Sequence, residues 1–116
     1  MILFVFLFCC FSIYTLVVYT TGTNVLSPEM NENAVKGKIL YQKYNCTACH
    51  QLFGLGGYLG PELTTTISQP GKGPLYASAL LSTGTLRMPD FHLSKEEINQ
   101  IVEFLKYVDS TVTHYK

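Results

Sequence analysis

The stretch Cys46-Thr47-Ala48-Cys49-His50 decides the fold of this chain. Two cysteines stand three residues apart, and a histidine directly follows the second one. Thiols at positions i and i+3 lie on one side of a helical turn, so each can add to one vinyl group of the same porphyrin. The adjacent histidine is then carried beneath the iron as its proximal ligand. The spacing therefore indicates one covalently attached haem c, held by Cys46 and Cys49 and ligated by His50.

Two other chemistries use a C-x-x-C spacing, namely zinc binding and dithiol redox catalysis. A structural zinc site needs further cysteines or histidines at ligand spacing, whereas only His92 and His114 follow residue 50. A thioredoxin-like dithiol accompanies a βαβ pattern, which this sequence does not show. The zinc interpretation is therefore disfavoured, and a dithiol remains the alternative to haem c.

Charge is distributed unevenly along the 116 residues. All eight basic and all eight acidic side chains lie within residues 29–116, so the formal net charge is zero and residues 1–28 are uncharged. The length fits one domain, and a soluble part of this size builds only a marginal apolar core unaided. A bound porphyrin would supply the missing apolar interior. The neutral balance argues against nucleic acid as a partner.

Residues 1–20, MILFVFLFCCFSIYTLVVYT, are almost continuously apolar. About 20 helical residues span the hydrocarbon core of a bilayer. A cleaved signal peptide would need a positive N-terminal region and a small-residue cleavage site, and neither is present. We therefore expect a retained membrane anchor over residues 1–20, a linker over 21–33 and a monohaem domain over 34–110. Cys9 and Cys10 lie inside the anchor and are expected to be packing residues.

Charge does not orient this anchor, because the first lysines, Lys36 and Lys38, lie far beyond the apolar run. Attachment of haem c takes place outside the cytoplasmic membrane. We therefore expect a single-pass protein of the cytoplasmic membrane with its haem domain on the periplasmic side.

Three helices are expected in the haem domain, over residues 34–45, 75–82 and 93–108. The first would be capped by Asn31 or Asn33 and would run directly into Cys46. Its side chains available to a core are Val35, Ile39, Leu40 and either Tyr41 or Tyr44. Residues 51–74, between the first two helices, are rich in glycine and are expected to form a loop.

The helix over residues 93–108 carries the clearest pattern in the sequence. Ser94 and Glu97 have the spacing of a capping box. One apolar stripe consists of Ile98, Ile101, Val102, Leu105 and Val108, flanked by Phe104. The polar tail from residue 109 is expected to fray.

Met88 is the candidate for the second axial ligand. Its thioether is a soft ligand that suits haem iron opposite a histidine, and it lies 38 residues after His50. Pro89 disfavours helical backbone at Met88 and keeps this loop extended. His92 is the rival ligand, although it and His114 are expected at the surface. The predicted metal ligands are thus His50 and Met88.

Residues 34–108 resemble a class I cytochrome c. The matching features are Gly37 with Tyr41, Cys46-Thr47-Ala48-Cys49-His50, Gly60-Pro61 with Leu63, Met88-Pro89, and Phe104. The resemblance implies an all-α fold around the haem, in which the first and last helices cross at Gly37. It also implies that the Pro61 carbonyl accepts a hydrogen bond from the His50 ring, which orients the imidazole.

A second set of residues narrows this resemblance. It comprises Gly54, Gly57-Tyr58, Gly60-Pro61-Glu62-Leu63, Arg87-Met88-Pro89-Asp90-Phe91 and Leu93-Ser94. These residues look like the cytochrome c subunit of bacterial nitric oxide reductases, which also has one membrane helix before one haem domain. The segment between anchor and first helix is shorter here than is usual in that subunit.

The narrower resemblance implies an electron-transfer subunit that binds no substrate. Its partners would be the membrane, a haem–copper-type catalytic membrane subunit, and an electron donor that is a cytochrome, a cupredoxin or a quinol-linked complex. Tyr58 would contact the haem, and with Glu62 it would line the haem edge or the partner interface, although both are equally compatible with ordinary loop positions.

Three alternative functions remain open from the sequence. The chain is also compatible with an anchored electron shuttle or with the cytochrome c subunit of a haem–copper oxygen reductase. A haem-based gas sensor is the third, and it requires that Met88 leave the iron readily.

Overall fold

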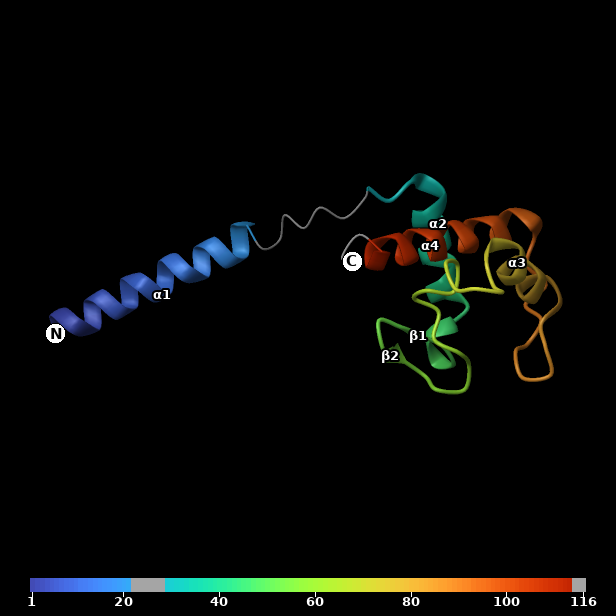
Figure 1. Ribbon diagram of the computed structural model, residues 1–116, viewed down its shortest axis with the longest axis horizontal. Coiled ribbons are helices and arrows are strands. Elements are labelled where there is room, and N and C mark those ends of the chain that lie inside the picture. Colours follow the sequence, from blue (N-terminus) through green and yellow to red (C-terminus); the bar gives the residue numbers. More distant parts are fainter. Residues whose placement is uncertain (22–28, 114–116) are drawn as a thin grey trace.

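The computed structural model describes residues 1–21 and 29–113 of the chain. The described elements are α1 (Ile2–Thr21), α2 (Glu32–Lys43), the 3₁₀ turn η1 (Cys46–Ala48), β1 (Gln51–Leu52), β2 (Leu55–Gly56), α3 (Pro74–Thr83) and α4 (Lys95–Thr113). Figure 1 shows α2 crossing α4, with α3 alongside α4. The expected helical fold is confirmed, apart from the short antiparallel hairpin β1–β2 within the glycine-rich segment. Part of the predicted linker lies outside the described residues.

Helix α1 is long and apolar enough to cross a membrane, as the sequence predicted. None of its residues is buried against other described parts of the chain. Its few hydroxyl groups bond to carbonyls one turn earlier: Ser12 to Phe8 at 2.8 Å and Thr15 to Phe11 at 2.8 Å. Because the hydroxyls are satisfied within the helix, they add little cost in an apolar surrounding.

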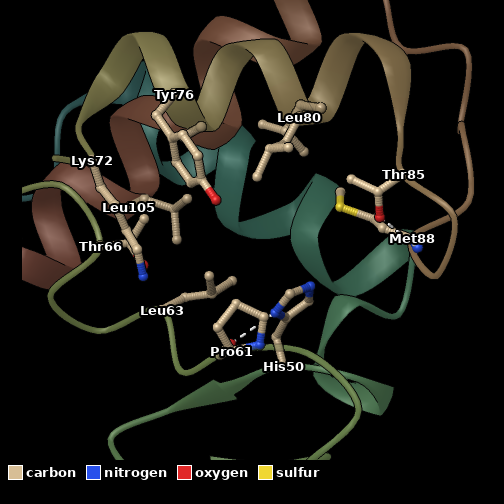
Figure 2. A pocket seen from close by; sticks show the side chains of 12 residues that line it. His50, Pro61, Leu63, Thr66, Lys72, Tyr76, Leu80, Thr85, Met88 and Leu105 are labelled. Atoms are coloured by element: carbon tan, nitrogen blue, oxygen red, sulfur yellow. Dashed lines mark hydrogen bonds between the residues drawn. The ribbon is translucent and has the colours of Figure 1, made fainter.

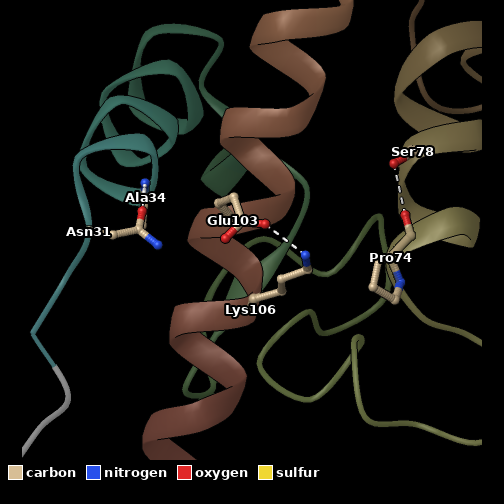
Figure 3. Close-up of polar contacts among 6 residues, drawn as sticks. All are labelled: Asn31, Ala34, Pro74, Ser78, Glu103 and Lys106. Carbon is tan, nitrogen blue, oxygen red and sulfur yellow. Dashed lines mark hydrogen bonds and ion pairs between the residues drawn. The ribbon is translucent and has the colours of Figure 1, made fainter.

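Helix α2 begins two residues earlier than predicted because Asn31 caps it. The Asn31 side chain accepts a hydrogen bond from the Ala34 amide at 2.8 Å (Figure 3). The helix ends at Lys43 instead of running into Cys46, so that part of the prediction is wrong. Val35 and Ile39 are also not core residues, since their exposed fractions are 42% and 58%. The face of α2 that is buried consists of Ala34, Gly37 and Tyr41.

The crossing of α2 and α4 requires a glycine at position 37. A Cβ atom on Gly37 would lie 1.9 Å from the carbonyl oxygen of Gln100 in α4. The two backbones are therefore in direct contact, as the resemblance implied. One turn further on, the Tyr41 and Phe104 rings pack with their centroids 5.5 Å apart.

Helix α4 carries the main part of the core. Its capping box forms as predicted, with the Ser94 amide donating to Glu97 at 2.9 Å and the Glu97 amide donating to the Ser94 hydroxyl at 3.2 Å. All five residues of the predicted apolar stripe are buried, and so is Phe104. On the outer face Lys106 pairs with Glu103 at 2.7 Å (Figure 3).

The prediction of a frayed tail after residue 108 is wrong. Helix α4 continues to Thr113, and Asp109 is 4% exposed. Its carboxylate accepts a hydrogen bond from the Ser68 amide at 2.7 Å. This long-range bond fastens the end of α4 to the loop before α3, which is why a polar stretch remains helical there.

Helix α3 closes the remaining side of the domain. Pro74 occupies its first turn, where a missing N–H costs little, and the Ser78 hydroxyl bonds to the Pro74 carbonyl at 2.8 Å (Figure 3). Its buried residues Ala77 and Leu81 pack against the apolar stripe of α4.

Candidate functional site

The Cys-x-x-Cys-His stretch forms one tight turn between α2 and the hairpin. Asn45 adopts the left-handed conformation, with φ of 51°, and so breaks the path of the chain after α2. The 3₁₀ turn η1 follows, and the amides of Cys49 and His50 both bond to the Cys46 carbonyl, at 3.2 and 2.9 Å. Both thiols and the imidazole thus belong to a single rigid turn.

The following loop holds the His50 ring closely from one side. The Gly60 amide donates to the Cys49 carbonyl at 2.8 Å. A Cβ atom on Gly60 would lie 2.4 Å from Cε1 of His50 and 2.9 Å from Nε2. A larger residue at position 60 would therefore displace the imidazole.

The next residue fixes the protonation of His50. Nδ1 of His50 lies 2.8 Å from the carbonyl oxygen of Pro61. A carbonyl oxygen can only accept a hydrogen bond, so Nδ1 carries the proton and Nε2 keeps its lone pair free to bind a metal. This is the contact that the class I resemblance implied.

Met88 reaches the same region from the loop between α3 and α4. The Thr85 amide donates to the Met88 carbonyl at 2.8 Å, and the Met88 amide donates to the Thr85 hydroxyl at 3.1 Å. These two bonds close a turn around Met88. Its partly buried side chain packs against the core cluster of α3 and α4.

His50 and Met88 line one apolar cavity of about 240 Å³, enclosed by α3, α4 and the loop after His50 (Figure 2). Its apolar walls are formed by Pro61, Leu63, Ala77, Leu80, Leu81 and Leu105. A smaller cavity of about 110 Å³ is lined by Cys46, Cys49, His50 and Met88 among others. The predicted cysteines, histidine and methionine are thus brought together around adjoining spaces.

One end of the larger cavity is polar. Figure 2 shows Lys72 and Tyr76 with their polar ends directed into the cavity, away from the end at which Met88 lies. A haem has an apolar ring with two carboxylates on one edge, so an apolar cavity with a cation at one end fits it. Neither residue was predicted from the sequence, because no spacing rule links them to His50. Thr85 was also missed, although a threonine three residues before Met88 is a recognisable turn signal.

The thiols do not have the character of a redox dithiol. Burial raises the pKa of the Cys46 thiol, whereas dithiol enzymes lower the pKa of the attacking cysteine. Among the described residues, no cluster of three or more histidine, cysteine or acidic side chains can hold a metal ion. The exclusion of a zinc site therefore stands for the described part of the chain.

Three predicted candidates lie elsewhere. Tyr58 is 86% exposed and lines neither cavity. The side chain of His92 is 88% exposed and lies 3.2 Å from the Asp90 carboxylate, so the structure does not bring it to Met88's position. His114 lies outside the described residues.

Most of the chain after α1 matches a known protein family. Residues 32–105 match the family described as cytochrome c oxidase, cbb3-type, subunit III. The matched range contains every residue that lines the two cavities.

The chain belongs to this cytochrome c family. A cytochrome c domain binds haem, so the cavity beside His50 and Met88 is the haem site of this cytochrome c.

Several relatives of this cytochrome c are named as the C-type subunit of nitric oxide reductase. The protein from Stutzerimonas stutzeri is 33% identical over 95 residues, which cover 74% of this chain and 65% of that protein. The proteins from Halomonas halodenitrificans and Paracoccus denitrificans are 27% and 26% identical over 103 and 108 residues. These cover 78% and 83% of this chain, and 69% and 72% of the relatives. The chain thus spans slightly less than two thirds of the Stutzerimonas relative.

Proposed function

We propose that this cytochrome c is a membrane-anchored monohaem subunit that passes electrons to the catalytic subunit of a nitric oxide reductase. Cys46 and Cys49 would hold the haem covalently, and His50 and Met88 would be its two axial ligands. The observation that carries the proposal is that His50 and Met88, from two different loops, line one cavity. With both axial positions filled by the protein, no position is left for a substrate, which favours electron transfer over catalysis.

The residues of the cavity have separable roles in this proposal. When bound, the haem supplies one-electron exchange between Fe(III) and Fe(II). His50 presents Nε2 as a ligand because Nδ1 is held by Pro61. The Met88 thioether raises the reduction potential relative to harder ligands. Leucines of α3, α4 and the loop exclude water, and Lys72 with Tyr76 offers polar atoms to the haem carboxylates.

The location follows from α1, whose length and apolar composition suit a single membrane-spanning anchor. We propose the orientation in which the haem domain lies on the periplasmic side of the cytoplasmic membrane. Residues 21–33 would then separate the domain from the bilayer. The electron donor would be a cytochrome, a cupredoxin or a quinol-linked complex.

The choice of partner rests on the relatives, since those named above are nitric oxide reductase subunits. The second candidate is the cytochrome c subunit of an oxygen-reducing haem–copper oxidase. It is favoured by the description of the matching family, which is a subunit of a cbb3-type oxidase. Both candidates use the same haem site and differ only in the catalytic partner.

Purification of the intact complex tests the proposal. The chain would carry a C-terminal affinity tag, the membranes would be extracted in mild detergent, and haems b and c in the eluate would be quantified from pyridine haemochrome spectra. We expect b-type haem in fixed ratio to haem c, and consumption of nitric oxide by the sample. Consumption of oxygen alone would support the second candidate. Elution of haem c alone would favour an anchored shuttle and contradict the subunit assignment.

Carbon monoxide separates these electron-transfer functions from a gas sensor. We expect the reduced protein at neutral pH not to bind carbon monoxide, because Met88 would occupy the sixth position. Rapid binding would support the sensor.

A further inference from the structure

Residues 62–64, directly after Pro61, form a closed hydrogen-bonded ring. The Thr64 amide donates to one oxygen of the Glu62 carboxylate at 3.1 Å, and the Thr64 hydroxyl donates to the other. Both carboxylate oxygens of Glu62 are therefore engaged by a residue two positions further along the chain. This ring limits the conformations that the backbone beside Pro61 can adopt.

The same hydroxyl links this ring to the segment that follows His50. The Phe53 amide donates to Oγ1 of Thr64 at 2.6 Å, and the Leu63 amide donates to the Gln51 carbonyl at 2.9 Å. Thr64 is 7% exposed, so these bonds are shielded from water. Phe53 has a φ of 53°, a left-handed conformation that a non-glycine residue adopts only where surrounding contacts hold it.

We propose that Thr64 and Glu62 are positioning residues for His50. They hold the Pro61 carbonyl in place, and this carbonyl accepts the Nδ1 proton of His50 at 2.8 Å. A ligating histidine with a well-aligned acceptor on its second nitrogen is more basic, and it stabilises the oxidised metal. The ring of Glu62 and Thr64 therefore sets the reduction potential through Pro61, without touching the haem. The inference rests on the proposed ligation by His50.

The test uses the full-length protein in detergent, with the histidines labelled by nitrogen-15. Thr64→Val removes the hydroxyl at nearly constant volume. We expect exchange of the His50 Nδ1 proton with solvent to accelerate about fivefold, the effect of losing one typical hydrogen bond. We also expect the midpoint potential to rise, because a less basic imidazole stabilises Fe(III) less.

Two matched variants make the result specific. Thr64→Ser keeps the hydroxyl and should restore the wild-type exchange rate and potential. Thr65→Val makes the same chemical change at the neighbouring exposed threonine, and it should leave both unchanged. Wild-type exchange and potential in Thr64→Val, with haem content intact, would overturn the inference.

A second variant covers the case in which Thr64→Val does not fold. Glu62 is exposed, so Glu62→Ala should fold and should also accelerate exchange of the Nδ1 proton. An unchanged rate in Glu62→Ala would overturn the positioning role alone. Absence of a porphyrin ring-current shift on His50 in the wild-type protein would overturn the ligation by His50 and the inference with it. Neither measurement depends on the identity of the catalytic partner.

Discussion

At the level of single residues, Met88 is held ready for its role by its own loop. Two hydrogen bonds to Thr85 fix its backbone, and its side chain lines the cavity that also contains His50. We predict that Met88→Ala keeps covalent haem, opens one coordination position and lowers the reduction potential, because a sulfur ligand that favours Fe(II) is lost. Loss of the near-infrared iron–sulfur charge-transfer band, together with redox titration, would measure both effects.

Met30→Ala is the matched control for this change. Met30 lies before α2 and lines neither of the two cavities. Its replacement should leave the spectrum and the potential as they are. A Met88→Ala protein with the wild-type spectrum would show that another residue ligates the iron.

At the level of elements, the crossing of α2 and α4 depends on the missing side chain at position 37. A methyl group there would lie 1.9 Å from the Gln100 carbonyl, so the helices would have to separate. We predict that Gly37→Ala lowers the free energy of unfolding by about 1–3 kcal/mol, as overpacking in cores does, although alanine favours helix. Denaturant unfolding followed by circular dichroism would measure the change. Lys38→Ala, at an exposed position on the same helix, should have little effect.

The start of α4 has a pH-dependent contribution to stability. Hydrogen bonds from the backbone and hydroxyl of Ser94 hold the pKa of Glu97 below its ordinary value of 4.5. A carboxyl whose pKa is lower in the folded state stabilises the protein above its unfolded pKa, and loses this effect as the pH falls through its folded pKa. We therefore predict that Glu97→Gln is less stable than the wild type at neutral pH, and that the difference disappears in acid below 4.5.

Thermal unfolding of both proteins across this pH range would check the prediction. Ser94→Ala serves as the comparison, since it removes a non-titrating hydroxyl and should cost about 1 kcal/mol at every pH. A gap between Glu97→Gln and the wild type that persists at low pH would contradict the proposed origin.

At the level of the whole molecule, the domain depends on what fills its centre. A cavity of about 240 Å³ lies between α3, α4 and the His50 loop, and such a space without occupant forfeits the packing of its walls. We predict that replacing both Cys46 and Cys49 by alanine abolishes haem that survives denaturing electrophoresis and lowers the thermal midpoint. Replacing both Cys9 and Cys10 should leave haem attachment unchanged, because those cysteines lie in α1. Covalent haem in the first variant would contradict the attachment site.

How much could be predicted from the sequence depends on the range of each interaction. The turn of Cys46 to His50, the capping box at Ser94, the apolar stripe of α4 and the apolar helix α1 were predictable, because each depends on side-chain types within a few residues of one another. The haem and its candidate ligands follow from the same local chemistry. The glycine at position 37 was also predictable, through the resemblance to cytochromes c.

Only the tertiary structure decided which distant segments meet. Local periodicity offered Val35 and Ile39 to a core, but α4 covers the other face of α2, and both side chains are exposed. The polar tail after residue 108 stays helical because the Ser68 amide reaches Asp109 from 41 residues away in the chain. The contribution of Lys72 to the cavity likewise depends on how the loop before α3 folds back. Such contacts join residues that no spacing relates, so their burial and bonding arise only when the chain has folded.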